Sequence, residues 1–549
     1  MMALVIAMVM TVAMVLPAMA EGSVADGASK TIKVDGLAAG DTVKYVQVIE
    51  WDQTAGWKWA SGFTDLSSQM LSEVVGTSTV AGKITDATAT AIAAKATSMT
   101  DGGSVAAGTT SWTKDNLAPG LYMVQAVATT AEVIYNPVFV AVQADGTGTV
   151  VTLPLNYADN GTAKKSDVTV DKKAKSAGDA EWQDATTEDV GDIIDYKVET
   201  TVPAYLESYT DPIFNVTDDL SDGLTFAVKE GSGEAALTDI TVKVGETALT
   251  LDTDYKITTK TTTKWVIEFQ KSYLQSRTAA TVVTIEYKAK ITDDAKSVNP
   301  ETNKVKIEYS RNPNDTSDHG TKEDKTTHYT FDIDAKLQGD DNYTTSEIIK
   351  VGKNADGTDI TETKTYSNKT THHPVDGAEF TLYKADGTTK YTNSTYPDGV
   401  VINSANGGLL EIKGLDEGIY VLKETKAATG YMLMTDYLEF KISATYKDVP
   451  ATATCNAYKE LDTYKVEVWH VAADGTKTQG NTSTYTLNQG TITKTNEVAG
   501  DQSNELINTK GQSLPSTGGM GTTIFYIIGA ILVIGAGILL VTRRRMNSN

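Results

Sequence analysis

Apolar and polar residues alternate along most of this chain. The alternation is clear in residues 31–36, 195–202 and 303–309, and Gly, Asp or Asn residues bound such stretches. A repeat of two is typical of strands that bury one face, because successive side chains of a strand point to opposite sides of the sheet. The pattern predicts a mainly β protein made of tandem β-sandwich domains.

Helical patterns are scarce and lie near the start of the chain. Residues 86–98 are rich in Ala and contain neither Gly nor Pro, and residues 63–75 are the next candidate. We therefore expect small helices in the first domain.

The first residues form an apolar segment of their own. Residues 1–17 are almost wholly apolar, and Ala18-Met19-Ala20 has the small-residue pattern of a signal peptidase site. A signal peptide over 1–20 is predicted, and the protein is expected to be exported. No Lys or Arg precedes the apolar region, which leaves open a true start codon further upstream.

A second apolar segment lies close to the other end. Residues 524–541 carry no charge, and at about 1.5 Å per residue they nearly span the hydrocarbon core of a bilayer. A transmembrane helix over 522–542 is predicted. The basic tail 543–549 contains three consecutive arginines, which favour the cytoplasmic side.

Composition narrows the function further. The 549 residues suggest about three domains, and the net charge of -23 opposes nucleic acid as a partner, because phosphate binding needs a basic face. The single cysteine, Cys455, cannot form an internal disulfide. The five histidines show no ligand spacing, so neither a metal nor another cofactor is expected.

An internal repeat places one carboxylate in an unusual position. Residues 117–126 and 415–424 align in the same frame, but the first copy ends on Ala126 where the second has Glu424. Glu424 shares one strand face with Tyr420 and Leu422, so it points toward a core, where an unpaired charge is costly.

The middle of the chain repeats this feature with three polar residues. By the same alternation Lys172, Asp218 and Asn303 each fall on the apolar face of their strand. A lysine, an acid and an asparagine are therefore predicted to meet in one core.

Such a cluster has a specific chemistry. Burial lowers the pKa of Lys and raises that of Asp or Glu, so both groups can become neutral. The amine can then attack the Asn carbonyl while the carboxyl polarises that carbonyl and moves the proton, and ammonia leaves. One self-catalysed event would form a Lys–Asn amide, a covalent staple in place of a disulfide. The alternative is a buried ion pair or hydrogen-bonded triad that does not react.

Several motifs carry a resemblance to a known family. Residues 420–431 resemble the E-box of pilins, with Ala428 in place of the usual Pro, and residues 377–384 resemble the early strand of collagen-adhesin B-type domains. Residues 514–518 are similar to the LPxTG sorting signal. With the tripartite layout, the chain resembles the backbone (major) subunits of sortase-assembled pili of Gram-positive bacteria.

The resemblance implies immunoglobulin-like domains and a division of the chain. The expected parts are an N-terminal pilin domain over 21–163, a middle isopeptide-forming domain over 164–322, and a C-terminal collagen-adhesin B-type domain over 323–512. The first domain is expected to lack an isopeptide bond because Ala126 replaces the acid.

The resemblance also assigns roles to residues. In the middle domain Lys172 would be joined to Asn303 with the help of Asp218. In the third domain Glu424 would promote a bond to Asn508, from either Lys350 or Lys336. The strand alternation slightly favours Lys350, which has the parity of Ile348, whereas Lys336 falls on the face opposite Phe331 and Ile333.

The sorting signal implies that a sortase cuts after Thr517 and joins it to a lysine of the next subunit. The usual V-Y-P-K type of motif is missing, and Lys165 or Lys164 is the candidate nucleophile. The signal comprises Leu514, Pro515, Ser516, Thr517 and Gly518.

The chain is thus predicted to be a substrate of an enzyme and not an enzyme itself. The implied partners are sortase, neighbouring pilin subunits and peptidoglycan, with host surface ligands as a further class. The product would be anchored in the cell wall, after the membrane helix has held the precursor. Two alternatives are a singly anchored adhesin of the same domain type and an anchored surface enzyme, although the sequence shows no catalytic constellation for the latter.

Overall fold

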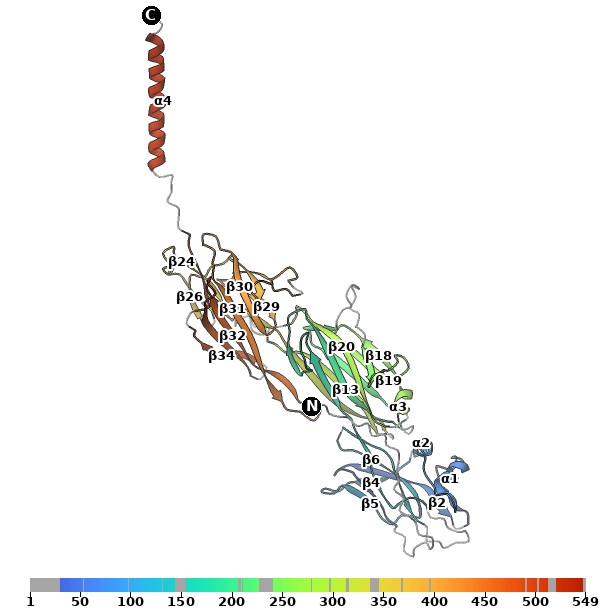
Figure 1. The fold of residues 1–549 in the computed structure, drawn as a ribbon. Helices are drawn as coiled ribbons and strands as arrows, with labels where there is room; N and C mark the ends of the chain where they lie inside the picture. Colours follow the sequence, from blue (N-terminus) through green and yellow to red (C-terminus); the bar gives the residue numbers. More distant parts are fainter. Residues whose placement is uncertain are drawn as a thin grey trace.

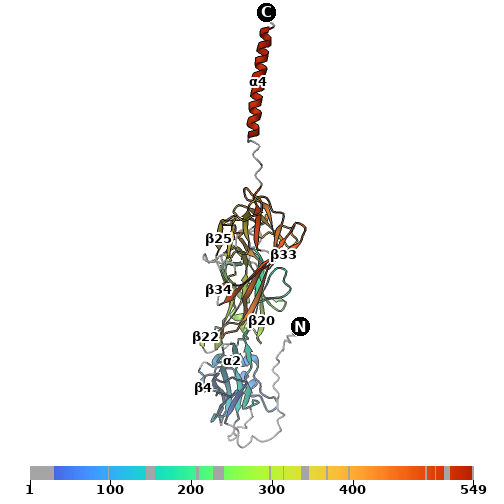
Figure 2. The ribbon, with the colours of Figure 1, turned by 90° about the vertical axis from the view of Figure 1, so that its left-hand side faces the viewer.

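Three β domains follow one another in an elongated row, with one helix at the far end (Figures 1 and 2). The predicted signal peptide, the sorting signal and Lys336 lie outside the described residues. The computed structural model describes residues 30–546 except 53, 97, 131, 144–154, 206–208, 210, 227–239, 278, 296–297, 313–314, 336–344, 367–368, 394–395, 489–490, 501–502 and 512–519.

The first domain packs two sheets around apolar cores. One sheet has the order β5-β1-β9, and the other has the order β3-β2-β6-β8 with β4 paired to β2. Their bounds are β1 Ile32–Asp35, β2 Thr42–Asp52, β3 Gly56–Trp59, β4 Thr100–Ser104, β5 Ser111–Lys114, β6 Gly120–Val127, β8 Val138–Val142 and β9 Asn160–Thr162.

Two helices accompany these sheets, as the sequence predicts. Helix α1 (Ser68–Val75) begins later than expected because the Ser67 side chain accepts the Met70 N–H and caps it. Helix α2 (Asp86–Lys95) is capped in the same way by Thr85 and ends three residues early. A further short helix, α3 (Lys271–Gln275), lies in the middle domain, where the sequence analysis did not predict one.

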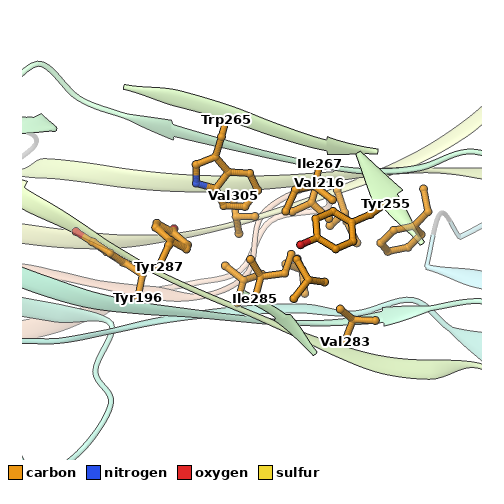
Figure 3. Packing of buried hydrophobic residues seen from close by; sticks show 14 of the residues in the cluster. Tyr196, Val216, Tyr255, Trp265, Ile267, Val283, Ile285, Tyr287 and Val305 are labelled. Atoms are coloured by element: carbon orange, nitrogen blue, oxygen red, sulfur yellow. The ribbon is translucent and has the colours of Figure 1, made fainter. Parts of the chain in front are cut away.

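The middle domain is a sandwich of two six-stranded sheets. One has the order β11-β13-β20-β16-β17 with β15 paired to β20, and the other has the order β12-β22-β21-β14-β19-β18. Their inward side chains form one apolar core (Figure 3). The bounds are β11 Val170–Lys175, β12 Ala185–Thr187, β13 Ile193–Val202, β14 Phe214–Leu220, β15 Leu224–Phe226, β16 Thr241–Val244, β17 Thr247–Ala248, β18 Tyr255–Lys260, β19 Lys264–Phe269, β20 Thr281–Ile291, β21 Glu301–Asn312 and β22 Asp315–Tyr329.

Strand pairing continues across the expected domain boundaries. Strand β10 (Lys165–Asp167) pairs with β7 (Val133–Tyr135), so the chain still contacts the first domain after residue 163. The expected boundary between residues 322 and 323 falls inside β22, which pairs with β21 as far as His328. A strand of the middle sheet therefore leads directly into the third domain.

The third domain is built on a seven-stranded sheet with the order β28-β27-β30-β31-β32-β33-β34. Three two-stranded pairs accompany it, namely β23-β29, β24-β35 and β25-β26. The bounds are β23 Phe331–Ile333, β24 Ile349–Lys353, β25 Thr363–Tyr366, β26 Lys369–His372, β27 Glu379–Lys384, β28 Val401–Asn403, β29 Ile412–Leu415, β30 Gly418–Lys426, β31 Tyr437–Val449, β32 Tyr458–Val471, β33 Lys477–Asn488, β34 Thr491–Val498 and β35 Glu505–Thr509.

The C-terminal helix α4 (Met520–Met546) stands apart from the domains (Figure 1). Residues Ile524–Met546 are long and apolar enough to cross a membrane, and protein buries none of the apolar window. The three arginines lie in the last turn, as the prediction of a transmembrane helix and basic tail requires.

Candidate cross-linking sites

The middle domain brings its three predicted residues together. Lys172 comes from β11 in one sheet, whereas Asp218 and Asn303 come from the adjacent strands β14 and β21 of the other. The register places Asp218 opposite Val305, two residues beyond Asn303. All three residues are fully buried between the sheets.

A tyrosine that the sequence analysis did not single out completes this cluster. The Lys172 Nζ lies 2.5 Å from Asp218 Oδ2 and also donates to the Tyr287 hydroxyl. That hydroxyl donates to Asp218 Oδ2 over 2.7 Å and accepts from Asn303 Nδ2 over 3.1 Å. Tyr287 therefore contacts the amine, the acid and the amide at once.

Aromatic rings lie beside the Lys172 amine, and Figure 3 shows the rings of Tyr196, Tyr287 and Trp265 in the core. The rings of Tyr196 and Tyr287 are stacked with centroids 5.2 Å apart, and the Lys172 Nζ lies 5.1 and 5.0 Å from these two centroids. The Trp265 ring packs edge-on against Tyr287. The rings keep water from the cluster and so strengthen its electrostatic interactions.

Burial sets the protonation of this cluster. It lowers the pKa of Lys172 and raises the pKa of Asp218, although each charge partly offsets the effect on the other. Both shifts favour a neutral amine beside a neutral carboxyl. Among the described residues Asp218 Oδ1 and Asn303 Oδ1 are buried without a hydrogen-bond partner, and a proton on the carboxyl would give the amide oxygen a possible donor.

The third domain has a second cluster of the same kind. Lys350 lies in β24 and Asn508 in β35, two parallel neighbours in which Asn508 is opposite Gly352. Glu424 comes from β30. Its carboxylate lies 3.3 Å from the Lys350 Nζ, and its two oxygens accept from Asn508 Nδ2 over 3.0 and 3.1 Å. One carboxyl group thus contacts both the amine and the amide.

The surroundings of Lys350 are apolar. Its Nζ lies 3.0 Å from Met434 Sδ, and the Met434 N–H holds Glu424 Oε2 over 2.7 Å. Burial lowers the pKa of Lys350 to about 8, even though Glu424 opposes the shift. About a tenth of this amine is therefore neutral at pH 7.

The first domain has an alanine at the position of the acid. Ala126 lies in β6 and is buried. Its methyl group packs in the apolar core with residues such as Val124 and Val140. The absence of an isopeptide bond in this domain stays a prediction.

The two candidate lysines for polymerisation lie where the first and middle domains meet. Lys165 begins β10, and its side chain is 54% exposed with its Nζ 3.4 Å from Asp167. Lys164 is exposed, and its carbonyl accepts from the Asn136 N–H. Either side chain could be reached by an enzyme.

Tyr287 left only a faint signal in the sequence. It occupies an inward position of β20, with the parity of Val283, Ile285 and Ala289. A hydroxyl at such a position needs a partner, but the partner strands are far away in sequence, so alternation alone does not reveal the contact.

Family models match three parts of the chain. Residues 190–313 match Gram-positive pilin backbone subunit 2, a Cna-B-like domain. Residues 358–459 match SpaA, a prealbumin-like fold domain, and residues 507–548 match the LPXTG cell wall anchor motif.

Known proteins are similar over longer stretches. The trypsin-resistant surface T6 protein of Streptococcus pyogenes serotype M6 is 26% identical over 450 residues, which is 75% of this chain and 76% of that protein. The solved structure of the T6 backbone pilin of the same serotype matches with a TM-score of 0.51 and 18% identity, over 89% of this chain and 100% of that one. The structural match shows a shared fold.

The chain is therefore a surface protein of the LPXTG-anchored class. Within that class it is a backbone subunit of a Gram-positive pilus, a structural protein of the covalently polymerised shaft. The apolar helix holds the precursor in the membrane, and the finished protein is anchored in the cell wall.

Proposed function

We propose that this shaft subunit is stabilised by two internal amide bonds, Lys172–Asn303 and Lys350–Asn508. One observation carries the proposal. In each cluster the lysine amine and the asparagine amide contact the same buried group, which is the Tyr287 hydroxyl in the middle domain and the Glu424 carboxyl in the third.

The cluster in the third domain supports the reaction most directly. The neutral Lys350 amine attacks Asn508 Cγ, and Glu424 takes a proton from the amine and gives one to the departing Nδ2. The fold already holds the groups together, so proximity replaces a bimolecular encounter. Asn508 Oδ1 is buried without a hydrogen-bond partner among the described residues.

The positions of the bonds suit a fibre under tension. A force applied at Lys165 would pass along the backbone to Lys172 and through the first amide bond to Asn303. From there it would follow the backbone to Lys350 and pass through the second amide bond to Asn508, and so to Thr517. Most of the residues of both domains would lie outside this covalent path. The shaft could then bear load without unfolding either domain.

The cross-links are tested by mass. The full-length chain, cut from its signal peptide and extracted in detergent, is expected to fall short of its sequence mass by two ammonia molecules. Digestion and mass spectrometry should then yield two branched peptides, one joining Lys172 to Asn303 and one joining Lys350 to Asn508.

The same digest separates the alternatives. A branched peptide that contains Lys336 would transfer the third-domain role to that residue. An unshifted mass would show buried triads that do not react and would reject the proposal. The first domain should contribute only linear peptides, because Ala126 stands at the position of the acid.

Polymerisation is proposed to join Thr517 of one subunit to Lys165 or Lys164 of the next. The segment from Gly511 to Thr517 can reach roughly 20 Å when fully extended. The acceptor lysine must therefore come close to the end of the third domain of its neighbour. Both lysines are exposed at the start of the middle domain, which supports their access to the sortase-bound Thr517.

Changing Lys164 and Lys165 together to Ala is expected to collapse the ladder of covalent polymers. Boiled cell-wall extracts of the unchanged strain should show high-mass bands on a denaturing gel, and the double variant should show a single band. Lys33→Ala, which removes another exposed lysine, should leave the ladder intact. A single band from the unchanged strain would instead favour a singly anchored adhesin.

A further inference from the structure

We propose that Tyr287 is a catalytic residue of the middle-domain cross-link and supplies the proton with which ammonia leaves Asn303. This inference rests on the proposed bond between Lys172 and Asn303. It assigns a different proton path to each of the two clusters in the chain.

The two clusters differ in what their acid can reach. Glu424 contacts both the lysine amine and the asparagine Nδ2 directly. Asp218 is one methylene shorter, and in the described structure its hydrogen bonds come from Lys172 and Tyr287. The Asn303 Nδ2 donates instead to the Tyr287 hydroxyl. The tyrosine therefore occupies the gap between the short acid and the amide.

The hydrogen bond between Asn303 and Tyr287 must change direction during the reaction. The nitrogen of a planar amide is a donor, because its lone pair is delocalised into the carbonyl. Once Lys172 has added to Cγ, Nδ2 becomes an ordinary amine and can accept a proton. The Tyr287 hydroxyl already lies 3.1 Å from Nδ2, so it is in place to donate a proton at that moment.

The protons balance through this hydroxyl. The Nζ–Cγ bond forms while the neutral Asp218 gives its own proton from Oδ1 to the Asn303 amide oxygen and takes one Nζ proton on Oδ2. Tyr287 gives its proton to Nδ2 and takes the proton from Oδ2, 2.7 Å away. The Cγ–Nδ2 bond breaks, ammonia leaves, and the carbonyl forms again as its oxygen returns the proton to Asp218 Oδ1. Tyrosine and carboxyl end as they began, so no further reactant is needed.

Two features of the site favour a concerted exchange. Burial raises the pKa of Tyr287 well above its usual range, so the phenol does not persist as an anion and gives its proton only as it receives another. The stacked Tyr196 ring and the edge of Trp265 fix the tyrosine ring. The hydroxyl is thus held between its two proton partners.

The test is the rate at which the bond forms in Tyr287→Phe. The full-length chain is synthesised in a cell-free system with detergent, and samples are digested over time to measure each branched peptide. We expect the Lys172–Asn303 bond to form at least about 100-fold more slowly, as is typical when a general acid is lost. The Lys350–Asn508 bond of the same molecule should form at its normal rate.

A matched control separates chemistry from packing. Tyr205→Phe removes another buried hydroxyl of the same core, one that donates to the Ser310 carbonyl over 3.0 Å. It should leave the cross-linking rate within about threefold of the unchanged rate, because it does not contact the cluster. A second variant adds Asp218→Glu to Tyr287→Phe, and the longer acid should restore part of the rate.

The outcomes distinguish the two levels of the proposal. If the unchanged chain never forms the bond, the proposed function fails. If the unchanged chain forms the bond and Tyr287→Phe forms it equally fast, only the role of Tyr287 is overturned. A slow rate in Tyr287→Phe that the longer acid does not raise, or an equally slow rate in Tyr205→Phe, would reduce the tyrosine to a packing residue.

Discussion

Asp218→Ala is expected to abolish the Lys172–Asn303 bond and to destabilise the middle domain by about 5 kcal/mol. This figure is the chain-entropy value for a cross-link that closes a loop on the order of 100 residues. The substitution also leaves the buried Lys172 amine without its acid, which adds to the loss. The change in stability is measured by digesting the protein with a protease at increasing urea concentrations. The urea concentration at which half of the middle domain is cleaved is compared between the variant and the unchanged protein.

The adjacent residue offers a control for this substitution. Asp219 follows Asp218 in β14, but it faces outward and its Oδ1 lies 3.0 Å from Lys264 Nζ with both side chains about two-fifths exposed. Asp219→Ala should cost no more than about 1 kcal/mol, the usual range for an exposed ion pair. Equal urea midpoints for the two variants, or a persisting branched peptide in Asp218→Ala, would contradict the assignment of the acid.

The burial of the cluster residues could be read from the sequence. Alternation placed Lys172, Asp218, Asn303 and Glu424 on inward faces, and all four are buried. Strand parity is a local property that holds wherever the strand is regular. It therefore identifies polar residues that enter a core, even when their partners are unknown.

The contacts between distant strands could not be read in this way. Lys350 and Asn508 lie on adjacent parallel strands that are separated in sequence by nearly the whole third domain. Tyr287 approaches Asp218 from the opposite sheet. Such contacts depend on the order of the strands in the sheets, which the alternation of apolar and polar residues does not specify. The resemblance to pilins supplied part of that information, but it did not include Tyr287.

The domain boundary shows a related limit. The resemblance to pilins implied a division after residue 322, whereas β22 continues to Tyr329 and pairs with β21 as far as His328. Tyr329, the last residue of β22, is buried. Its hydroxyl accepts a hydrogen bond from the Leu461 N–H of the third domain. A strand shared in this way joins two domains without a linker, so no change in composition marks the boundary.

The formation of the Lys350–Asn508 bond is expected to depend steeply on pH. Burial lowers the pKa of Lys350 to about 8, and only the neutral amine can attack. Well below that pKa the neutral fraction falls about tenfold for each pH unit, so the bond should form roughly 50-fold more slowly at pH 6 than at pH 8. Above the pKa the amine is already neutral and the rate should level off.

To measure this dependence, the newly synthesised protein is unfolded at once, before the bond can form. It is then refolded in buffers of different pH. The branched peptide is followed over time, and tryptophan fluorescence verifies that refolding itself is complete at every pH. A rate that is flat from pH 6 to 8 would show that Lys350 loses its proton to Glu424 within the pair, because a proton exchanged inside a neutral pair does not respond to the solution. A fall in rate on acidification would show that Lys350 must release its proton to solution before the bond can form.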